Sequence, residues 1–105
     1  MSKPIKELQL FNDLCAIEET LIERGWCKHD MITSDGRVCV LGAANIIYGI
    51  GVDSVQALTV CERAFAVARA LKSVMGIVTI FNDDPKTTFE DILAKLREAR
   101  EALVR

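Results

Sequence analysis

The segment from Asp53 to Met75 constrains the fold most, because its pattern predicts a long helix that is apolar over most of its circumference. Glu62, Arg69 and Ser73 line one edge as a narrow polar strip, and Val, Ala, Leu, Phe and Cys occupy most of the rest. A helix with so little polar surface is normally surrounded by other elements. We therefore expect this segment to be the central helix of a helical bundle.

Two further helices are predicted towards the ends of the chain. Residues 2–24 place their apolar side chains on one half of a helical cylinder, and Gly25 ends the pattern. The last helix is predicted from about Thr88 onward, with Thr87 and Glu90 in capping-box spacing at its start. Its inner stripe consists of Phe89, Ile92, Leu93, Leu96, Ala99 and Leu103.

Two shorter apolar segments are ambiguous between helix and strand. The run from Val38 to Val52 is almost wholly apolar, and a short buried helix over Cys39–Tyr48 is the preferred interpretation. A buried strand stays open as an alternative, because periodicity does not separate the two forms in so short a run. Residues 77–81 are β-branched and predict a strand or an ordered connection, and residues 82–87 predict a turn.

The longest polar stretch lies between Trp26 and Arg37, and its Asp35-Gly36 pair is a strong turn signal. The residues on either side predict a short β-hairpin near 31–39. The expected fold class is therefore mostly α: a compact bundle of four main helices around a central apolar helix, with this hairpin beside it. At 105 residues the chain is expected to form a single domain, 1–105.

Charge and hydropathy exclude several classes of partner. Thirteen basic and fifteen acidic residues leave a net charge of −2, which argues against broad surfaces for nucleic acid or anionic membranes. No apolar run approaches the roughly 18 residues of a membrane span, and no apolar secretory segment opens the chain. The four cysteines lack C-x-x-C spacing and are expected to be reduced. A cytoplasmic location is the expectation.

Glu18 lies in the middle of the apolar arc of the first predicted helix. A buried carboxylate without a partner is unfavourable, so Glu18 is expected to pair with Arg63, Arg69, Lys72 or His29. One interpretation is a tuned acid/base or a ligand anchor. The favoured interpretation is an interhelical ion pair or a hydrated edge of the helix.

His29 is the sole histidine, and it lies between Cys27 and Cys39 in the sequence. These three residues are of metal-ligand type, but their spacing is not that of a zinc knuckle, so no metal and no cofactor are predicted. Cys39 at a helix N-terminus beside His29 would form a nucleophilic pair, which is the enzymatic interpretation. A structural Cys39 and a surface His29 are favoured instead.

Two motifs resemble those of a known family. Residues 36–43 have the pattern G-x-x-C-x-x-G-A after Trp26, and residues 82–87 have the pattern N-D-x-P-x-T. The chain thereby resembles a family of short uncharacterised bacterial and phage proteins, from which it departs at Phe81, where the family pattern has Trp. The resemblance implies a compact, mostly helical domain and assigns no catalytic roles. It also implies that the following residues meet in space: Trp26, Cys39, Phe81, Asn82 and Asp83.

Two functions from different classes follow from these observations. The leading hypothesis is a non-enzymatic protein-interaction module, an accessory or inhibitor protein of phage or mobile-element origin, whose partner is another protein or a second copy. The alternative is a small enzyme or ligand-binding domain that uses Glu18, His29, Cys39 or Asp83 in a cleft. Neither nucleic acid nor a membrane is a predicted partner. The candidate functional cluster is Glu18, Trp26, His29, Cys39, Phe81, Asn82 and Asp83.

Overall fold

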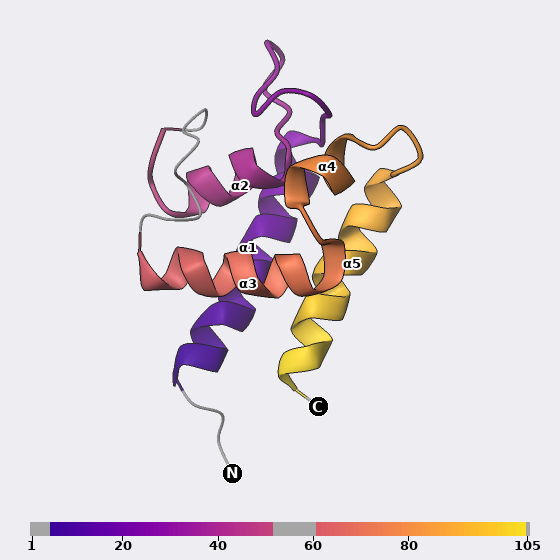
Figure 1. Cartoon of the computed structure of the whole chain (residues 1–105). Helices are drawn as coiled ribbons and strands as arrows, with labels where there is room; N and C mark the ends of the chain where they lie inside the picture. Colours follow the sequence, from indigo (N-terminus) through magenta and orange to yellow (C-terminus); the bar gives the residue numbers. More distant parts are fainter. Residues whose placement is uncertain (1–4, 52–60, 105) are drawn as a thin grey trace.

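Helix α1 runs from Ile5 to Arg24 in the computed structural model, which describes residues 5–51 and 61–104 (Figure 1). Gly25 ends the helix as predicted: its φ of 90° is accessible to glycine, and its N–H donates to the Leu21 carbonyl at 2.8 Å. The predicted start at residue 2 lies outside the described residues.

Helix α2 spans Val40–Ile47, so the preferred interpretation of the apolar run is confirmed and the strand alternative is wrong. Cys39 is its N-cap, and the Cys39 sulfur accepts a hydrogen bond from the Gly42 N–H at 3.3 Å. Tyr48 is the C-cap. The helix is buried along Val40 and residues 42–45, as its composition predicts.

Helix α3 spans Glu62–Met75 and begins later than predicted. Cys61 has extended backbone angles, φ −161° and ψ 171°, so a helix continuous from Asp53 through Cys61 is wrong. The predicted start at Asp53 lies outside the described residues. The sequence has no Gly or Pro near Cys61, so local propensity does not reveal its extended backbone.

The position of α3 differs in one respect from the expected central helix. It lies against α1, α4 and α5, while α1 lies against α2, α3 and α5, so the two helices share the centre of the bundle. The buried face of α3 is narrow, and Phe65 on another face is 45% exposed. That buried face consists of Ala64, Val67, Leu71 and Met75.

Helix α4 spans Val78–Asp83, so the strand alternative for residues 77–81 is wrong and the turn predicted from residue 82 begins later. No strand lies alongside it within the described residues, and its backbone groups are paired in a helix instead, as in the Phe81 N–H bond to the Ile77 carbonyl. Gly76, with φ 73°, makes the sharp connection from α3.

Helix α5 spans Phe89–Leu103 and confirms the predicted inner stripe, with Ile92, Leu96 and Ala99 buried. Its capping box is formed by Thr88 and Asp91, one residue later than the predicted Thr87 and Glu90. Thr87 is instead buried, and its N–H closes a turn by donating to the Asp84 carbonyl at 3.0 Å.

The predicted hairpin near 31–39 is reduced to a tight turn and one isolated antiparallel bridge, Ile32–Val38. The Gly36 N–H donates to the Thr33 carbonyl at 3.0 Å, which closes the turn. Val38 bridges both Trp26 and Ile32, and its N–H bonds to Gly25 rather than continuing along one strand. The described residues therefore form no β-ladder here.

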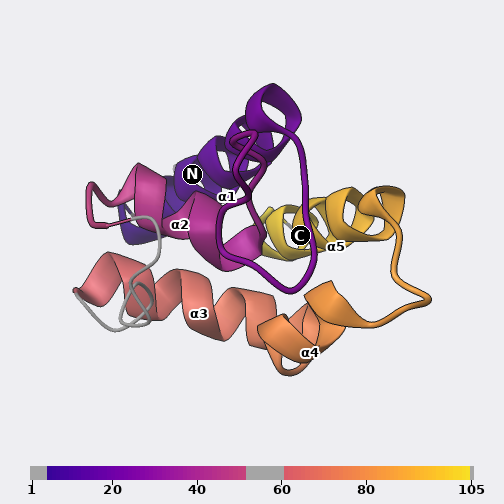
Figure 2. The ribbon, with the colours of Figure 1, turned by 90° about the horizontal axis from the view of Figure 1, so that it is seen from above.

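The mostly helical class is confirmed, and five helices enclose one apolar core in the described residues. Seen from above, α2 and α5 lie on either side of α1, and α3 and α4 lie across from it (Figure 2). The segment between α1 and α2 lies over one end of this arrangement, where it meets α4. No helix in the described parts of the chain is long and apolar enough to cross a membrane.

Candidate functional site

Asn82 on α4 joins three segments through its side-chain amide, which is 2% exposed. Its oxygen accepts from the Trp26 indole N–H at 2.8 Å and from the Val40 N–H at 3.2 Å. Its nitrogen donates to the Cys27 carbonyl at 3.1 Å and to Asp83 Oδ1 at 2.9 Å. One side chain therefore connects three segments: the loop between α1 and α2 (residues 25–39), the start of α2 and the end of α4.

Trp26 extends this junction to α5. Its ring stacks on Phe89 with 5.8 Å between the ring centroids and an angle of 11° between the planes. The Lys28 ammonium lies 5.4 Å from the Trp26 ring centroid and donates to the Asp84 carbonyl at 2.6 Å. The loop is thus held to both α4 and α5.

Asp83 holds the loop at His29. Its Oδ1 accepts the His29 backbone N–H at 2.8 Å, and its Oδ2 lies 4.0 Å from the His29 ring Nδ1. Burial raises the pKa of Asp83, but the bonds from His29 and Asn82 and the nearby Lys28 charge outweigh burial and hold it below its usual value. His29 has φ 70°, a left-handed conformation that is uncommon for a non-glycine residue, and the bond from its N–H to Asp83 holds it there.

The Cys39 thiol is held in its protonated form. Burial raises the pKa of Cys39, and the hydrogen bond from the Gly42 N–H opposes burial only in part. Burial and the neighbouring Cys39 also raise the pKa of Cys27, from 9.0 to about 11. Both thiols are free, and both are protonated at neutral pH.

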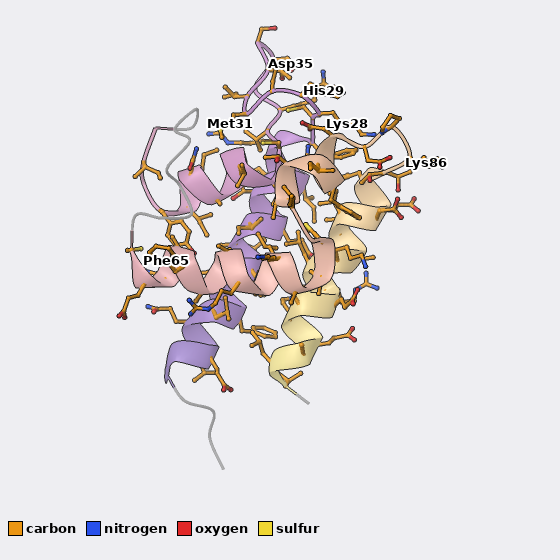
Figure 3. All side chains as sticks on the ribbon, in the orientation of Figure 1. Lys28, His29, Met31, Asp35, Phe65 and Lys86 are labelled. Atoms are coloured by element: carbon orange, nitrogen blue, oxygen red, sulfur yellow. The ribbon has the colours of Figure 1, made fainter. Side chains whose placement is uncertain are left out.

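A pocket of about 150 Å³ lies between the loop and α4, and we call it the loop pocket. Figure 3 labels Lys28, His29 and Met31 on the segment that lies over α2 and α4. Four of the predicted cluster residues line the loop pocket: His29, Cys39, Asn82 and Asp83. Within residues 5–51 and 61–104, no group of three or more His, Cys, Asp or Glu side chains could hold a metal ion.

Phe81 and Glu18 lie apart from the loop pocket. Phe81 is half-buried against the core, and it borders a different depression, between α4 and α5. Glu18 pairs with Arg100 of α5, with 3.0 Å between Oε1 and Nη1. The expected partners from α3 and His29 are therefore wrong: α5 runs beside α1 in the opposite direction (Figure 1), and Arg100 of α5 is the partner of Glu18.

Sequence reasoning missed the most buried carboxylate of the described residues, Asp13, which is 5% exposed. Arg63 binds both of its oxygens, with Nη2–Oδ1 at 2.6 Å and Nε–Oδ2 at 3.2 Å, and the Tyr48 hydroxyl donates to Oδ2 at 3.1 Å. Burial first, and then Asp13, raise the pKa of Tyr48. Asp13 lies one turn before Ile17 at the border of the apolar arc, and that position was its signal.

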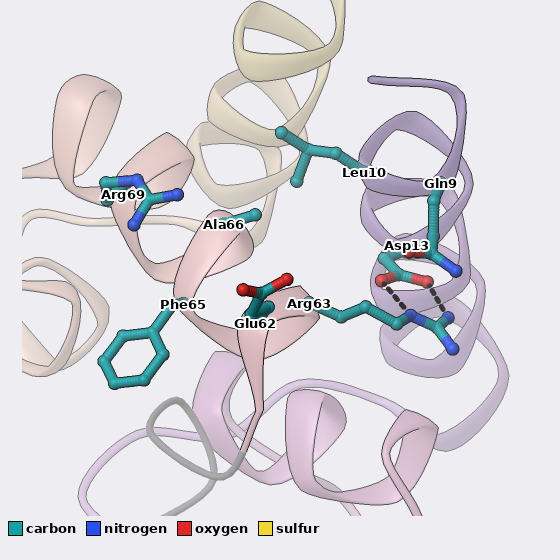
Figure 4. Close-up of a pocket in the computed structure, with 8 residues that line it drawn as sticks. All are labelled: Gln9, Leu10, Asp13, Glu62, Arg63, Phe65, Ala66 and Arg69. Atoms are coloured by element: carbon teal, nitrogen blue, oxygen red, sulfur yellow. Dashed lines mark hydrogen bonds and ion pairs between the residues drawn. The ribbon is translucent and has the colours of Figure 1, made fainter. Parts of the chain in front are cut away.

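This ion pair forms one wall of a second pocket, of about 300 Å³, between α1 and α3 (Figure 4). The pocket is lined by Gln9, Leu10, Asp13, Glu62, Arg63, Phe65, Ala66 and Arg69. Arg63 and Tyr48 both bind the Asp13 carboxylate. Asp13 therefore links α1 to α2 and α3, and its charge is neutralised by Arg63.

The model of a family of unknown function, DUF6197, matches residues 12–102. The chain belongs to this family. The matched range includes both motif regions of this DUF6197 chain, residues 36–43 and 82–87. The chain has no significant match among curated proteins or solved structures. The family carries no assigned activity, so membership assigns no function to this DUF6197 protein.

Proposed function

We propose that this chain is a non-enzymatic protein-interaction module that receives a side chain of a partner protein in the loop pocket. In this proposal it acts in the bacterial cytoplasm as an accessory or inhibitor protein of phage or mobile-element origin, a setting that the family resemblance suggests. The size of the loop pocket carries the proposal. At about 150 Å³ it is smaller than the roughly 300–1,000 Å³ of small-molecule sites, and it is of the size that one anchoring side chain fills.

The chemistry of the lining supports binding over catalysis. A cysteine nucleophile needs a lowered pKa, whereas burial raises the pKa of Cys39. A general acid needs a raised pKa, whereas that of Asp83 is lowered. The Asn82 amide is engaged on both its oxygen and its nitrogen. The polar groups of the loop pocket therefore hold the loop in place.

The lining also indicates the chemistry of the partner. Met31, Leu41 and Val78 supply apolar surface, while Asp30 and Asp83 supply negative charge at the same pocket. Charge complementarity therefore favours a segment that presents an apolar side chain next to Lys or Arg. The apolar side chain fills the pocket and the cation lies beside the two carboxylates.

The test is partner capture from extracts of the native host, followed by calorimetry with a synthetic peptide of the captured segment. Thr79 is exposed and lines the loop pocket, so Thr79→Arg should fill the pocket without disturbing the core. Ser73→Arg, at an exposed position on α3, is the matched control. We expect binding that is at least about tenfold weaker for Thr79→Arg, corresponding to about 1.4 kcal/mol, and unchanged for Ser73→Arg. Equal binding by wild type and Thr79→Arg would contradict the proposal.

The second candidate is a small ligand-binding or enzymatic site, because His29, Cys39 and Asp83 line one pocket. Thiol alkylation at neutral pH separates the two candidates. In an interaction module the buried Cys39 reacts with iodoacetamide more slowly than the exposed Cys61. Alkylation of Cys39 that is faster than that of Cys61 would favour the enzymatic candidate.

A further inference from the structure

The pocket between α1 and α3 is separate from the loop pocket, because the two share no lining residue (Figure 4). We call it the α1–α3 pocket. Its volume of about 300 Å³ is twice that of the loop pocket and reaches the lower end of the range of small-molecule sites, roughly 300–1,000 Å³. We therefore expect a small molecule to fill it, in contrast to the single side chain expected in the loop pocket.

The α3 wall of this pocket carries opposite charges at its two ends. Phe65 and Ala66 lie three and four residues after Glu62, and Arg69 lies four and three residues after them, a spacing that keeps all four side chains along one side of the helix. Glu62 and Arg69 are thus seven residues apart, or about 10 Å along the helix axis. Charged side chains on a helix pair at three or four residues, so these two do not neutralise each other.

Both of these charged groups are available to a ligand. Glu62 and Arg69 are exposed, and neither side chain makes a hydrogen bond or an ion pair with the described residues. The second guanidinium of the lining belongs to Arg63, and Asp13 binds it through two bonds. One carboxylate and one guanidinium therefore remain without a partner in the described structure.

The middle of the α1–α3 pocket is apolar. Phe65 and Ala66 supply apolar surface from α3, and Leu10 supplies it from α1. Figure 4 shows the Leu10 side chain pointing toward Ala66, which lies between Arg69 and Glu62. Phe65 is 45% exposed, so a hydrocarbon ligand would remove apolar surface from water here. The order of groups along the pocket is therefore anion, hydrocarbon, cation.

We propose that the α1–α3 pocket binds a small zwitterion whose ammonium and carboxylate groups lie at opposite ends of a hydrocarbon chain. The ammonium group pairs with Glu62. The carboxylate pairs with Arg69, whose planar guanidinium matches it with two parallel hydrogen bonds. The chain lies between Leu10, Phe65 and Ala66. Free ω-amino carboxylates and a lysine at the C-terminus of a peptide share this chemistry.

The charges of the lining favour this class over singly charged ligands. The lining contains two carboxylates and two guanidinium groups, so its charges cancel and a net neutral ligand matches it. An anion bound at Arg69 leaves Glu62 unpaired and is repelled by it. A cation bound at Glu62 has the same disadvantage at Arg69. Specificity arises from these unfavourable contacts as well as from the favourable ones.

The first test is titration calorimetry of the full chain with ε-aminocaproate, and with caproate and hexylamine, which each carry one of its two charged groups. ε-Aminocaproate should bind at least about tenfold more tightly than either. Glycine should also bind weakly, because its two charges are too close together to reach both Glu62 and Arg69. Equal affinities for ε-aminocaproate, caproate and hexylamine would overturn the proposal, and so would the absence of ε-aminocaproate binding up to about 10 mM.

The second test assigns each charge of the ligand to a residue. Arg69→Gln should weaken ε-aminocaproate binding at least about tenfold without weakening that of hexylamine, which lacks the carboxylate. Glu62→Gln should do the same without weakening the binding of caproate. Arg97→Gln and Glu101→Gln, at exposed positions on α5, are the matched controls and should bind like wild type. Wild-type affinity for ε-aminocaproate in either pocket variant would contradict the assignment.

A further ligand distinguishes the two sources of the zwitterion. Nα-acetyl-lysine presents the carboxylate and the side-chain ammonium of a C-terminal lysine. Tighter binding of Nα-acetyl-lysine than of ε-aminocaproate identifies a peptide end as the ligand, and the reverse order identifies a free ω-amino carboxylate. Both orders support the proposal. Thr79 does not line the α1–α3 pocket, so Thr79→Arg should bind these ligands like wild type, whatever its effect at the loop pocket.

Discussion

The indole N–H of Trp26 donates to the side-chain oxygen of Asn82 across 56 residues of sequence, at 2.8 Å. This bond closes the loop after α1 onto α4, and Asn82 accepts the Val40 N–H at the same oxygen. The residues of the two motif regions thus meet at one buried amide. Because this amide makes its bonds in the interior, its loss leaves buried donors and acceptors without partners.

Asn82→Ala should destabilise the chain by about 2–4 kcal/mol, because the Trp26 and Val40 donors and the Cys27 carbonyl all lose their partner. Urea unfolding monitored by Trp26 fluorescence measures the change. Thr79→Ala, an exposed change on the same helix, is the control and should fall within about 0.5 kcal/mol of wild type. A loss at Asn82 no larger than that of the control would show that this amide does not hold the loop.

Gly42→Ala should destabilise the chain by about 1–3 kcal/mol, because α2 approaches the loop closely at this glycine. A Cβ built on Gly42 overlaps the backbone carbonyl oxygen of Met31 and lies 3.3 Å from the Val38 Cβ. Gly36→Ala is the comparison, since its Cβ meets no atom within 4 Å and its φ of 91° is the remaining source of strain. Thermal unfolding should rank Gly42→Ala as the more damaging change, and the reverse order would contradict the close approach.

A segment of this fold is predictable from the sequence where residues within a few turns determine its structure, and it is not where distant segments determine it. The stripe of α5 and the helix α2 follow from periodicity and composition, which act over a few turns. The segment from Ile77 to Phe81 does not, because its β-branched residues favour a strand and the described residues provide no strand to pair with. The extended backbone at Cys61 is equally invisible, since no Gly or Pro marks it.

The candidate site divides in the same way. The family resemblance implied that Trp26 and Asn82 lie together, and the two side chains are hydrogen-bonded. Phe81 lies on another side of α4, because adjacent helical residues point about 100° apart. The partner of Glu18 depends on how α5 packs along α1, so no local pattern identifies Arg100. Asp13 was missed for the same reason, since its partners Tyr48 and Arg63 come from two other segments.

The Asp13–Arg63 pair should couple α1 to α3 measurably. Asp13 is buried, but the Arg63 side chain is 48% exposed, so solvent screens part of the attraction. Asp13→Ala should destabilise the chain by about 1–3 kcal/mol, since a charged bidentate bond and the Tyr48 bond are lost together. A double-mutant cycle with Arg63→Ala isolates the pair, and additive losses would show that the two side chains are not coupled.

Cys27 should make stability fall at alkaline pH. Its pKa is raised from 9.0 to about 11 in the fold by burial and by Cys39, so the folded chain retains a proton that the unfolded chain releases. The stabilisation is fully present below pH 9 and is lost as pH rises towards 11, with a slope of at most about 1.4 kcal/mol per pH unit. Urea unfolding of wild type and Cys27→Ala across this range measures the slope, which should be shallower in the variant. Equal slopes for the two proteins would show that Cys27 titrates alike in the folded and unfolded chains.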